Sequence, residues 1–307
     1  MSAVAAHAAL PDVRGTYRQC ADLSRTTWFG TGGRADVLFR PADEDDLVQF
    51  MATRPTGLAV TVLGVGSNVL VRDHGIAGVT IRLGRGFTGI TVEGLEVQAG
   101  AAALDGHVAR QAAAAGISGL EFLAGVPGTI GGAIAMNAGA YGCEIADVLV
   151  RVRAVAPDGT VHDLPADDLG HGYRHCALAG EWIFTSCVLR GEPGTKPAIE
   201  ARIREIQDRR ALTQPTKERT GGSTFRNPPP PQARAWELID RAGCRGLRRG
   251  GAMVSEKHCN FLVNTGAASA TDLETLAEDV RRRVWTSQGV CLEWEIRCLG
   301  RLPGEAP

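Results

Sequence analysis

Several features that would point directly to a class of protein are missing from this sequence. The eight cysteines of the 307-residue chain are scattered, with no CxxC pair and no His/Cys cluster at zinc-ligand spacing. This pattern predicts reduced thiols and no metal site. No apolar run reaches the roughly 18 residues needed to span a bilayer, and residues 1–11 lack the basic start and apolar run of a signal peptide. We therefore expect a cytoplasmic protein that does not insert into a membrane.

An excess of charge of either sign is also missing. The formal net charge is -1, so no general field attracts nucleic acid or an anionic membrane, and an acidic ligand must be held by local groups. We expect no nucleic-acid partner. Hydrophobic residues make up 44% and charged residues 22%, which is close to the average of soluble globular proteins. The length predicts two domains or one large domain.

Glycine, in contrast, is abundant. The chain contains 39 glycines, nearly twice the expected share, without a collagen-like period. Such a composition predicts many tight turns, or backbone that packs closely against a ligand.

The order of the expected elements indicates an α+β fold. Short strands dominate the first two thirds, and helices and strands mix in the last third, which argues against a regular βαβ series. Residues 1–20 show no periodicity and are expected to be a loosely ordered extension. A change of composition at Gly191–Pro197 predicts a linker, which divides the remaining chain into domains at 21–195 and 196–307.

Local signals predict particular elements within these domains. Asp105 is expected to cap a helix that ends before Gly116, and Thr271–Glu274 reads as the capping box of another helix. The turn Pro157–Thr160 between two β-branched runs predicts a hairpin. A short helix is expected over 235–242.

The loop 64–68, Gly-Val-Gly-Ser-Asn, is the first candidate binding site. It does not complete a Rossmann fingerprint, because Val69 stands where the third glycine should be and a strand follows instead of a helix. Its successive backbone N–H groups, with the Ser67 hydroxyl and the Asn68 amide, can still form an anion-binding concavity. A structural turn is an equal alternative for this loop alone. The second glycine-rich segment, 125–142, favours a long phosphate-containing cofactor, for which a flavin dinucleotide is the natural candidate.

The stretch Gly221–Pro228, Gly-Gly-Ser-Thr-Phe-Arg-Asn-Pro, is the second candidate. Its two glycines free the backbone, and a hydroxyl, an aromatic ring, a guanidinium and an amide follow before the proline run 228–231. Composition alone favours a surface turn, because Gly, Ser, Asn and Pro are turn residues. Together with the two glycine-rich segments, we interpret the stretch as part of a ligand site.

Five motifs stand in a fixed order along the chain: Gly64–Leu70, Gly125–Gly132 with Asn137–Gly142, Gly172–Arg174, Gly222–Pro228 and Glu295–Arg297. Together they resemble the motif set of the UDP-N-acetylenolpyruvoylglucosamine reductase family, the flavoenzymes of peptidoglycan precursor synthesis. The resemblance runs from about Thr27 to Gly300. The length and Ser255–Phe261 resemble the shorter subclass, which lacks a tyrosine-bearing insertion. Arg226 departs from the lysine of many members, so a planar fork replaces a point charge.

The resemblance implies a fold. We expect a two-subdomain FAD-binding domain of the vanillyl-alcohol oxidase (PCMH) type over 21–195, followed by a smaller α+β substrate-binding domain over 196–307. FAD is expected to be non-covalent, because the loop 64–70 contains no His or Cys for a flavin link. A monomer is expected.

The resemblance also implies a reaction. NADPH reduces FAD, and the flavin gives hydride to C3 of the enolpyruvyl group of UDP-N-acetylglucosamine enolpyruvate, a UDP-sugar enolpyruvyl ether. A proton is then added at C2, which yields UDP-N-acetylmuramate. The intermediate is enolate-like, so it needs positive charge and hydrogen-bond donors at its carboxylate and an acid near C2.

The resemblance assigns these roles to residues of the motifs. Arg174 binds the carboxylate, Ser223 donates the proton, and Glu295 acts on the developing charge as a protonated acid or through a hydrogen bond. The alternating strand pattern alone does not choose between Glu293 and Glu295. The expected substrate-binding residues are Tyr173, Arg226, Asn227 and His258, and a structural histidine is an equal alternative for His258. The expected cofactor-binding residues are Gly64, Gly66, Ser67, Asn68, Val69, Gly125, Pro127, Gly128, Gly131, Gly132, Asn137, Gly139, Ala140, Tyr141 and Gly142.

Two other functions stay open from the sequence. An alcohol oxidase of the same FAD fold would pass its electrons to oxygen. A non-catalytic nucleotide-sugar binder would use the glycine loops for phosphates only, and its lack of a flavin absorption spectrum would distinguish it.

Overall fold

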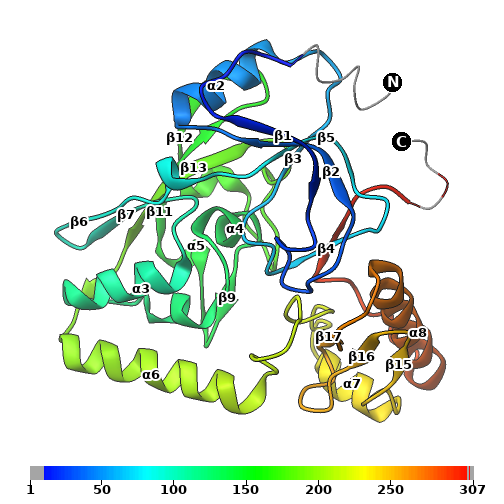
Figure 1. Cartoon of the computed structure of the whole chain (residues 1–307). Coiled ribbons are helices and arrows are strands. Elements are labelled where there is room, and N and C mark those ends of the chain that lie inside the picture. Colours follow the sequence, from blue (N-terminus) through cyan, green and yellow to red (C-terminus); the bar gives the residue numbers. More distant parts are fainter. Residues whose placement is uncertain (1–9, 303, 305–307) are drawn as a thin grey trace. The chain divides into compact units, whose positions relative to one another are not determined.

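The computed structural model describes residues 10–302 and residue 304, and packing divides the chain into two compact units. Unit 1 comprises the described residues of 1–19, 37–64 and 78–209, and unit 2 those of 20–36, 65–77 and 210–307. Each unit is therefore assembled from several pieces of chain (Figure 1). The functional domains expected from the sequence, 21–195 and 196–307, are instead continuous stretches of chain. Their assignment stays a prediction.

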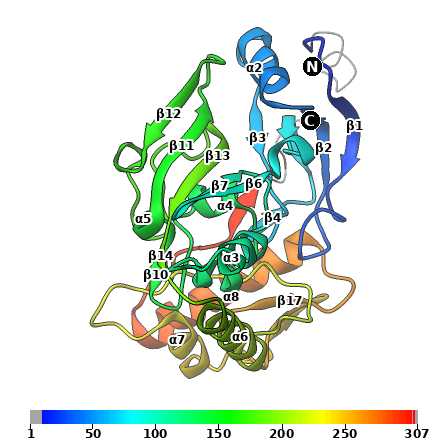
Figure 2. The same cartoon turned by 90° about the vertical axis from the view of Figure 1, so that its left-hand side faces the viewer.

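The main sheet of unit 1 is antiparallel and has five strands. Its order is β12 (Val161–Pro165), β11 (Leu149–Val155), β13 (Ile183–Arg190), β7 (Glu96–Gly100) and β6 (Ile90–Glu93). Figure 2 shows β12, β11 and β13 side by side. The predicted hairpin is confirmed, because Val155 pairs with Val161 and the N–H of Ala156 donates to the carbonyl of Thr160.

Helices pack on this sheet through small and branched apolar side chains. The helices α3 (Asp105–Ala114) and α4 (Ile130–Ala135) share one core with the sheet, to which α6 (Lys196–Thr213) adds Ile199 and Ile203. Because burial of apolar area stabilises by about 25 cal/mol per Å², this shared core stabilises unit 1.

A second sheet has the order β1 (Thr16–Asp22), β2 (Arg34–Arg40), β5 (Ile76–Ile81) and β3 (Val60–Val62), and the helix α2 (Glu44–Thr53) accompanies it. The rings of Phe39 and Phe50 pack with centroids 4.7 Å apart. The helix starts where Asp43 accepts a hydrogen bond from the N–H of Asp46, and its first turn is acidic, as the helix dipole favours. Part of the expected loose extension thus lies in β1, and residues 1–9 lie outside the described chain.

The two predicted helix caps are wrong. Asp105 is the first residue of α3 rather than its N-cap, and complete burial raises the pKa of its carboxyl well above the ordinary value. The helix α8 (Ala270–Gln288) begins before the predicted box, because Ser269 and Asp272 cap it reciprocally, each bond being 3.0 Å long. Thr271 is not available as a cap, since its hydroxyl donates to the carboxylate of Asp73 at 2.7 Å.

Unit 2 packs two helices against short strands. Its three-stranded sheet has the order β15 (Arg248–Arg249), β16 (Ala252–Val254) and β17 (Leu262–Asn264). The helices are α7 (Ala235–Arg241), which confirms the predicted short helix, and α8, and the strand β4 (Val69–Val71) pairs in parallel with β18 (Arg297–Leu299). No helix of the described residues is both long enough and apolar enough to cross a membrane.

Short elements of unit 1 complete the fold: β8 (Ile117–Ser118), β9 (Gly139–Ala140), β10 (Cys143–Glu144), α5 (Ile145–Val148), β14 (Glu192–Pro193) and the 3₁₀ helices η1 (Arg85–Phe87), η2 (Glu121–Gly125) and η3 (Ala166–Leu169). Part of the expected linker is thus a strand, because β14 pairs with β8.

Candidate active site

The loop 65–68 of unit 2 has a backbone that only glycine allows. Gly66 has a φ of +68°, and a Cβ at this position would lie 2.6 Å from the carbonyl oxygen of Thr26. The N–H of Trp28 donates to the carbonyl of Gly66 at 3.0 Å, which fixes the loop. The loop therefore has one defined shape.

This loop fits the pyrophosphate of a dinucleotide. The backbone N–H groups of Gly66, Ser67 and Asn68 donate to no acceptor within residues 10–302. Consecutive N–H groups of this kind bind anions, and the Ser67 hydroxyl adds one more donor. The donor set thus matches the anion-binding interpretation made from the sequence.

Ser223 lies on an extended stretch that pairs with a distant segment of unit 2. It forms a β-bridge with Phe261, and the next N–H, that of Thr224, donates to the carbonyl of Asn260 at 2.7 Å. The Asn260 side chain accepts from the N–H of Phe225 at 3.0 Å and donates to its carbonyl at 2.8 Å. Thr224 and Phe225 are buried, so the stretch is a supported segment and not a surface turn.

Glu295 is joined to both of these features through its backbone. Its N–H donates to the carbonyl of Thr224 at 2.8 Å, and its carbonyl accepts from the side-chain amide of Asn68 at 3.1 Å. Unit 2 therefore brings together the predicted phosphate loop, Ser223 and Glu295, which lie far apart in the sequence.

The structure also distinguishes the two glutamates. Glu293 is exposed, and within the described part of the chain it is engaged only through its carbonyl, which accepts from the N–H of Arg226 at 2.9 Å, whereas Glu295 is half-buried. This difference supports Glu295 as the glutamate of the site.

The other substrate residues predicted in unit 2 flank this stretch. Asn227 is exposed, and its Oδ1 accepts from the N–H of Ala235 at the start of α7 at 3.1 Å. The Nδ1 of His258 accepts from the N–H of Asn260 at 3.3 Å. Burial lowers the pKa of His258, which leaves the ring neutral at pH 7.

In unit 1, Arg174 lies at the tip of a tight turn. Gly172 and His175 exchange both backbone hydrogen bonds, at 3.0 and 3.1 Å, and Arg174 between them has a φ of +53°. Its guanidinium donates to the carbonyls of Gly139 at 2.8 Å and of Asn137 at 3.3 Å. Two acceptors therefore set the direction of the cation.

Asn137 holds this cluster together from inside. It is fully buried with a φ of +40°, and its Nδ2 donates to the Glu144 carboxylate at 2.8 Å and to the carbonyl of Gly172 at 3.1 Å. Its Oδ1 accepts from the N–H of Ala146 at 3.0 Å. Asn137 was predicted to bind cofactor; the contacts seen are with protein, and the cofactor role stays a prediction.

Two tyrosines belong to the same part of unit 1. Tyr141 has a φ of +56°, and its hydroxyl donates to the carbonyl of Ile206 at 3.2 Å. Tyr173 is 51% exposed, and the Arg174 guanidinium carbon lies 5.4 Å from its ring centroid. Non-glycine residues with positive φ are rare and are enriched at functional sites, which agrees with the predicted role of this region.

The structure also shows on which elements the remaining predicted cofactor residues lie. Val69 opens β4, and the others lie in the glycine-rich part of unit 1: Gly64 near the Thr129 hydroxyl, Gly125 at the end of η2, Pro127 and Gly128 before α4, Gly131 and Gly132 in α4, Gly139 and Ala140 in β9, and Gly142 in the following turn. Their cofactor roles stay predictions.

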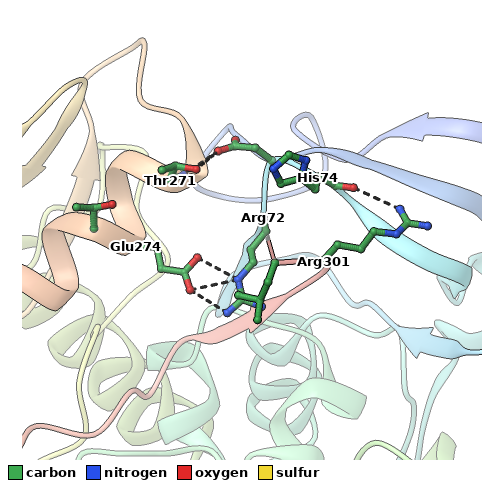
Figure 3. A pocket seen from close by; sticks show the side chains of 8 residues that line it. Arg72, His74, Thr271, Glu274 and Arg301 are labelled. Atoms are coloured by element: carbon green, nitrogen blue, oxygen red, sulfur yellow. Dashed lines mark hydrogen bonds and ion pairs between the residues drawn. The ribbon is translucent and has the colours of Figure 1, made fainter. Parts of the chain in front are cut away.

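A cavity of about 180 Å³ in unit 2 contains none of the predicted residues (Figure 3). Glu274 faces Arg72 there with N–O distances down to 2.8 Å, and the Asp73 carboxylate accepts from the N–H groups of Ala270 and Thr271 at the start of α8. Because these charged groups have partners within the protein, we interpret the residues that line the cavity as a structural ion-pair network.

Sequence reasoning missed some supporting residues. Asn260 entered the sequence analysis only as part of the segment Ser255–Phe261, and Glu144 and His171 were not predicted as site residues. His171 accompanies the Arg174 turn, with its Nε2 at 3.1 Å from the carbonyl oxygen of Ile134. No short motif marks such residues, because their partners come from other segments. No group of three or more His, Cys, Asp or Glu able to hold a metal occurs among the described residues.

Two family models match the chain. Residues 35–165 match an FAD binding domain, and residues 214–299 match the C-terminal domain of UDP-N-acetylenolpyruvoylglucosamine reductase.

Relatives cover nearly the whole chain. The chain is 55% identical over 294 residues to UDP-N-acetylenolpyruvoylglucosamine reductase of Rhodospirillum rubrum, covering 95% of this chain and 92% of the relative. It is 54% identical over 291 residues to the enzyme of the same name in Parvibaculum lavamentivorans, covering 95% and 93%. The chain belongs to the UDP-N-acetylenolpyruvoylglucosamine reductase family.

A solved structure agrees with this family membership. The crystal structure of UDP-N-acetylenolpyruvylglucosamine reductase from Thermus caldophilus has a TM-score of 0.80 and 36% identity, and the match covers 94% of this chain and 100% of that one. The predicted α+β class, with an FAD-binding domain followed by a second domain, is confirmed. As a member of the UDP-N-acetylenolpyruvoylglucosamine reductase family, the protein is an FAD-dependent oxidoreductase.

Proposed function

We propose that the protein reduces UDP-N-acetylglucosamine enolpyruvate to UDP-N-acetylmuramate with NADPH, in the cytoplasm, as a step of peptidoglycan precursor synthesis. The observation that carries the proposal is the 55% identity over 95% of the chain to a reductase of this substrate. The joining of the phosphate loop, Ser223 and Glu295 within unit 2 supports it independently.

The chain's own residues fit non-covalent FAD. The N–H groups of Gly66, Ser67 and Asn68 would hold the pyrophosphate, because they donate to no acceptor among the described residues. When bound there, FAD would supply the hydride for C3 of the enolpyruvyl group, with NADPH as the source of the electrons.

Arg174 binds the substrate carboxylate. Its guanidinium is already oriented by the carbonyls of Gly139 and Asn137, so little reorganisation is needed as negative charge grows on the carboxylate. Asn137 and Glu144 act through Arg174 as positioning residues.

Ser223 donates the proton to C2. A serine hydroxyl is a weak acid, but the enolate is a strong base, and a donor on a supported segment transfers faster than solvent does. Glu295 stabilises the same developing charge as a protonated acid or through a hydrogen bond. Arg226, Asn227, Tyr173 and His258 hold the remaining parts of the substrate.

Replacement of Ser223 by Ala tests the assignment. Flavin reduction by NADPH should be unchanged, whereas reoxidation by substrate, followed by stopped-flow absorbance, should slow about 10²- to 10⁴-fold because the general acid is lost. Thr224→Val is the matched control, since the Thr224 hydroxyl is buried without a hydrogen-bond partner in the described chain. Equal slowing of both half-reactions in Ser223→Ala would contradict the role of Ser223. Reoxidation by oxygen in place of substrate would contradict the proposed function itself.

A further inference from the structure

Asp105 in unit 1 carries a carboxyl group that the proposed reaction does not use. The residue is completely buried, and neither carboxyl oxygen has a hydrogen-bond partner among the described residues. Asp105 is the first residue of α3, and a helix N-terminus favours negative charge. That effect is small beside the free energy needed to bury an ionised carboxylate without a partner. The group is therefore a neutral acid in the folded protein.

The surroundings of Asp105 do not favour its ionisation. Burial raises the pKa of the carboxyl, and no charged side chain of the described chain lowers it. The thiol of Cys187 on β13 faces the carboxyl, and its own pKa is raised first by burial and then by Asp105. The other titratable side chains on α3, on β13 and on the elements packed against α3 are His107, Arg110, Arg190, Glu93, Glu96 and Glu121. Glu96 pairs with Arg190, and Glu121 accepts from the N–H of Gly119.

The backbone of Asp105 is bonded to the glycine-rich segment that is predicted to bind FAD. The stretches 101–105 and 128–131 pair side by side, with a β-bridge between Leu104 and Thr129. The N–H groups of Asp105, Ile130 and Gly131 donate to the carbonyls of Gly128, Ala103 and Ala101, at 3.2, 3.0 and 2.8 Å. A displacement of Asp105 therefore also displaces the segment 128–131.

The two stretches are packed too closely for Asp105 to move without separating them. A Cβ added to Gly131 would lie 3.0 Å from the Cβ of Ala101. Gly128 and Gly131 are both predicted cofactor residues, so the paired arrangement is the one on which FAD binding depends.

We propose that the proton on Asp105 keeps the stretches 101–105 and 128–131 paired, so that retention of FAD depends on this proton. The inference rests on the predicted cofactor role of 128–131. When the O–H bond of the carboxyl breaks, the proton passes to water and a carboxylate is left in the core. The carboxylate is stable only where it reaches water, so Asp105 moves away and its bond with Gly128 is lost. Asp105 is thus a positioning residue for the cofactor site.

The direction of the pH effect follows from the two forms of the segment. In the open form the carboxyl has its ordinary pKa of about 3.9, and in the paired form burial raises that pKa. The free energy that keeps the stretches paired is therefore complete below the ordinary pKa and is lost as pH rises toward the raised pKa. One proton is released on opening, so opening becomes about tenfold more frequent for each pH unit in this range.

Hydrogen–deuterium exchange of the holoenzyme tests this coupling. Between about pH 6 and pH 8, the protection factors of the N–H groups of Asp105, Ile130 and Gly131 should fall about 10- to 100-fold in the wild type. In Asp105→Asn, whose side chain is neutral at every pH, they should stay constant. Release of FAD, followed by flavin fluorescence, should increase over the same range in the wild type and not in Asp105→Asn. An infrared band of a protonated carboxyl should be present in the wild type at neutral pH and absent from the variant.

Thr80→Val is the matched control, because the Thr80 hydroxyl of unit 1 is also buried without a partner in the described chain but does not titrate. It should keep the pH dependence of the wild type. Protection factors that stay constant with pH in the wild type would overturn the role of Asp105, even if Asp105→Asn does not fold. An equal fall in Asp105→Asn would also overturn it. If the purified protein carries no flavin, the cofactor assignment fails, and the exchange measurement still decides whether the proton keeps the stretches paired.

Discussion

The Arg174 region of unit 1 and the Ser223 region of unit 2 are built in different ways. Asn137, Tyr141 and Arg174 are three of the four non-glycine residues with positive φ in the described chain, and carbonyl groups hold the Arg174 side chain. Around Ser223, the support comes instead from backbone pairing between segments that are distant in sequence.

This difference reflects what each region has to hold. A long flexible side chain such as Arg must be oriented, and unit 1 does so with a strained backbone and fixed acceptors. A serine hydroxyl has almost no reach, so its backbone must be placed, and unit 2 does so with ladder-like hydrogen bonds. Substitutions should therefore act through local conformation in unit 1 and through pairing in unit 2.

The largest expected effect concerns the Arg174 side chain. Arg174→Lys keeps the charge but cannot donate to two carbonyls with a planar fork, so kcat/KM should fall about 10²- to 10³-fold, as for loss of a preorganised donor. Steady-state kinetics would measure this, and the flavin spectrum should be unchanged. Arg202→Ala, an exposed arginine of α6 paired with Glu205, is the control and should be near wild type. Full activity in Arg174→Lys would show that a positive charge is enough at this position and that the planar guanidinium is not required.

A smaller effect compares one glycine from each unit. In Gly66→Ala the new Cβ meets the carbonyl oxygen of Thr26 at 2.6 Å, so FAD affinity should fall about 10- to 100-fold, given strain of about 1–3 kcal/mol. Gly57→Ala also has a positive φ, of +79°, but its Cβ meets nothing within 4 Å. It should cost only about 1–2 kcal/mol of stability. Fluorescence titration of the apoproteins with FAD measures the affinity of each variant. An equal loss of FAD affinity in both variants would contradict the predicted difference between the two glycines.

The stability of variants at two buried asparagines, one in each unit, tests the same comparison. Asn137→Ala and Asn260→Ala each leave backbone partners without bonds and should lower the free energy of unfolding by about 2–4 kcal/mol. Gly at position 137 should recover part of the loss, because φ is +40° there. Gly at position 260 should recover none. Urea denaturation of the four variants would show this, and equal recovery at both positions would argue against stored strain in unit 1.

The smallest expected effect is a pH dependence shared by both units. Burial lowers the pKa of His171 in unit 1 and of His258 in unit 2 below the unfolded value of about 6.5. As pH falls, these histidines therefore take up protons in the unfolded state before they do so in the folded state. Their contribution to the free energy of unfolding is complete above the unfolded pKa and is lost as pH falls through the folded pKa. The melting temperature should decrease below neutral pH, and His171→Gln or His258→Gln should flatten that decrease. An unchanged slope in both variants would exclude these histidines as the cause.

The candidate site could be proposed from the sequence because five local motifs occur in a fixed order. Taken alone, the Gly64–Asn68 loop and the run that carries Ser223 are equally or better explained as turns, and Arg174 was assigned only through the resemblance to the family. The capping errors at Asp105 and Thr271 arose because tertiary partners override local signals: Asp105 is buried in a core, and Asp73 engages Thr271. The strand β1 was missed because most of its residues are polar or exposed, so they carry no apolar alternation.

The sequence by itself determined the α+β class, the ordered motifs and the residue types that the chemistry requires. Only the tertiary structure decided that Asn68 and Glu295, 227 residues apart, are bonded, and that Glu295 rather than Glu293 is half-buried. The physical reason is that propensity and spacing act over a few residues. Burial, backbone pairing and ring contacts, in contrast, depend on which distant segments the folded core brings together.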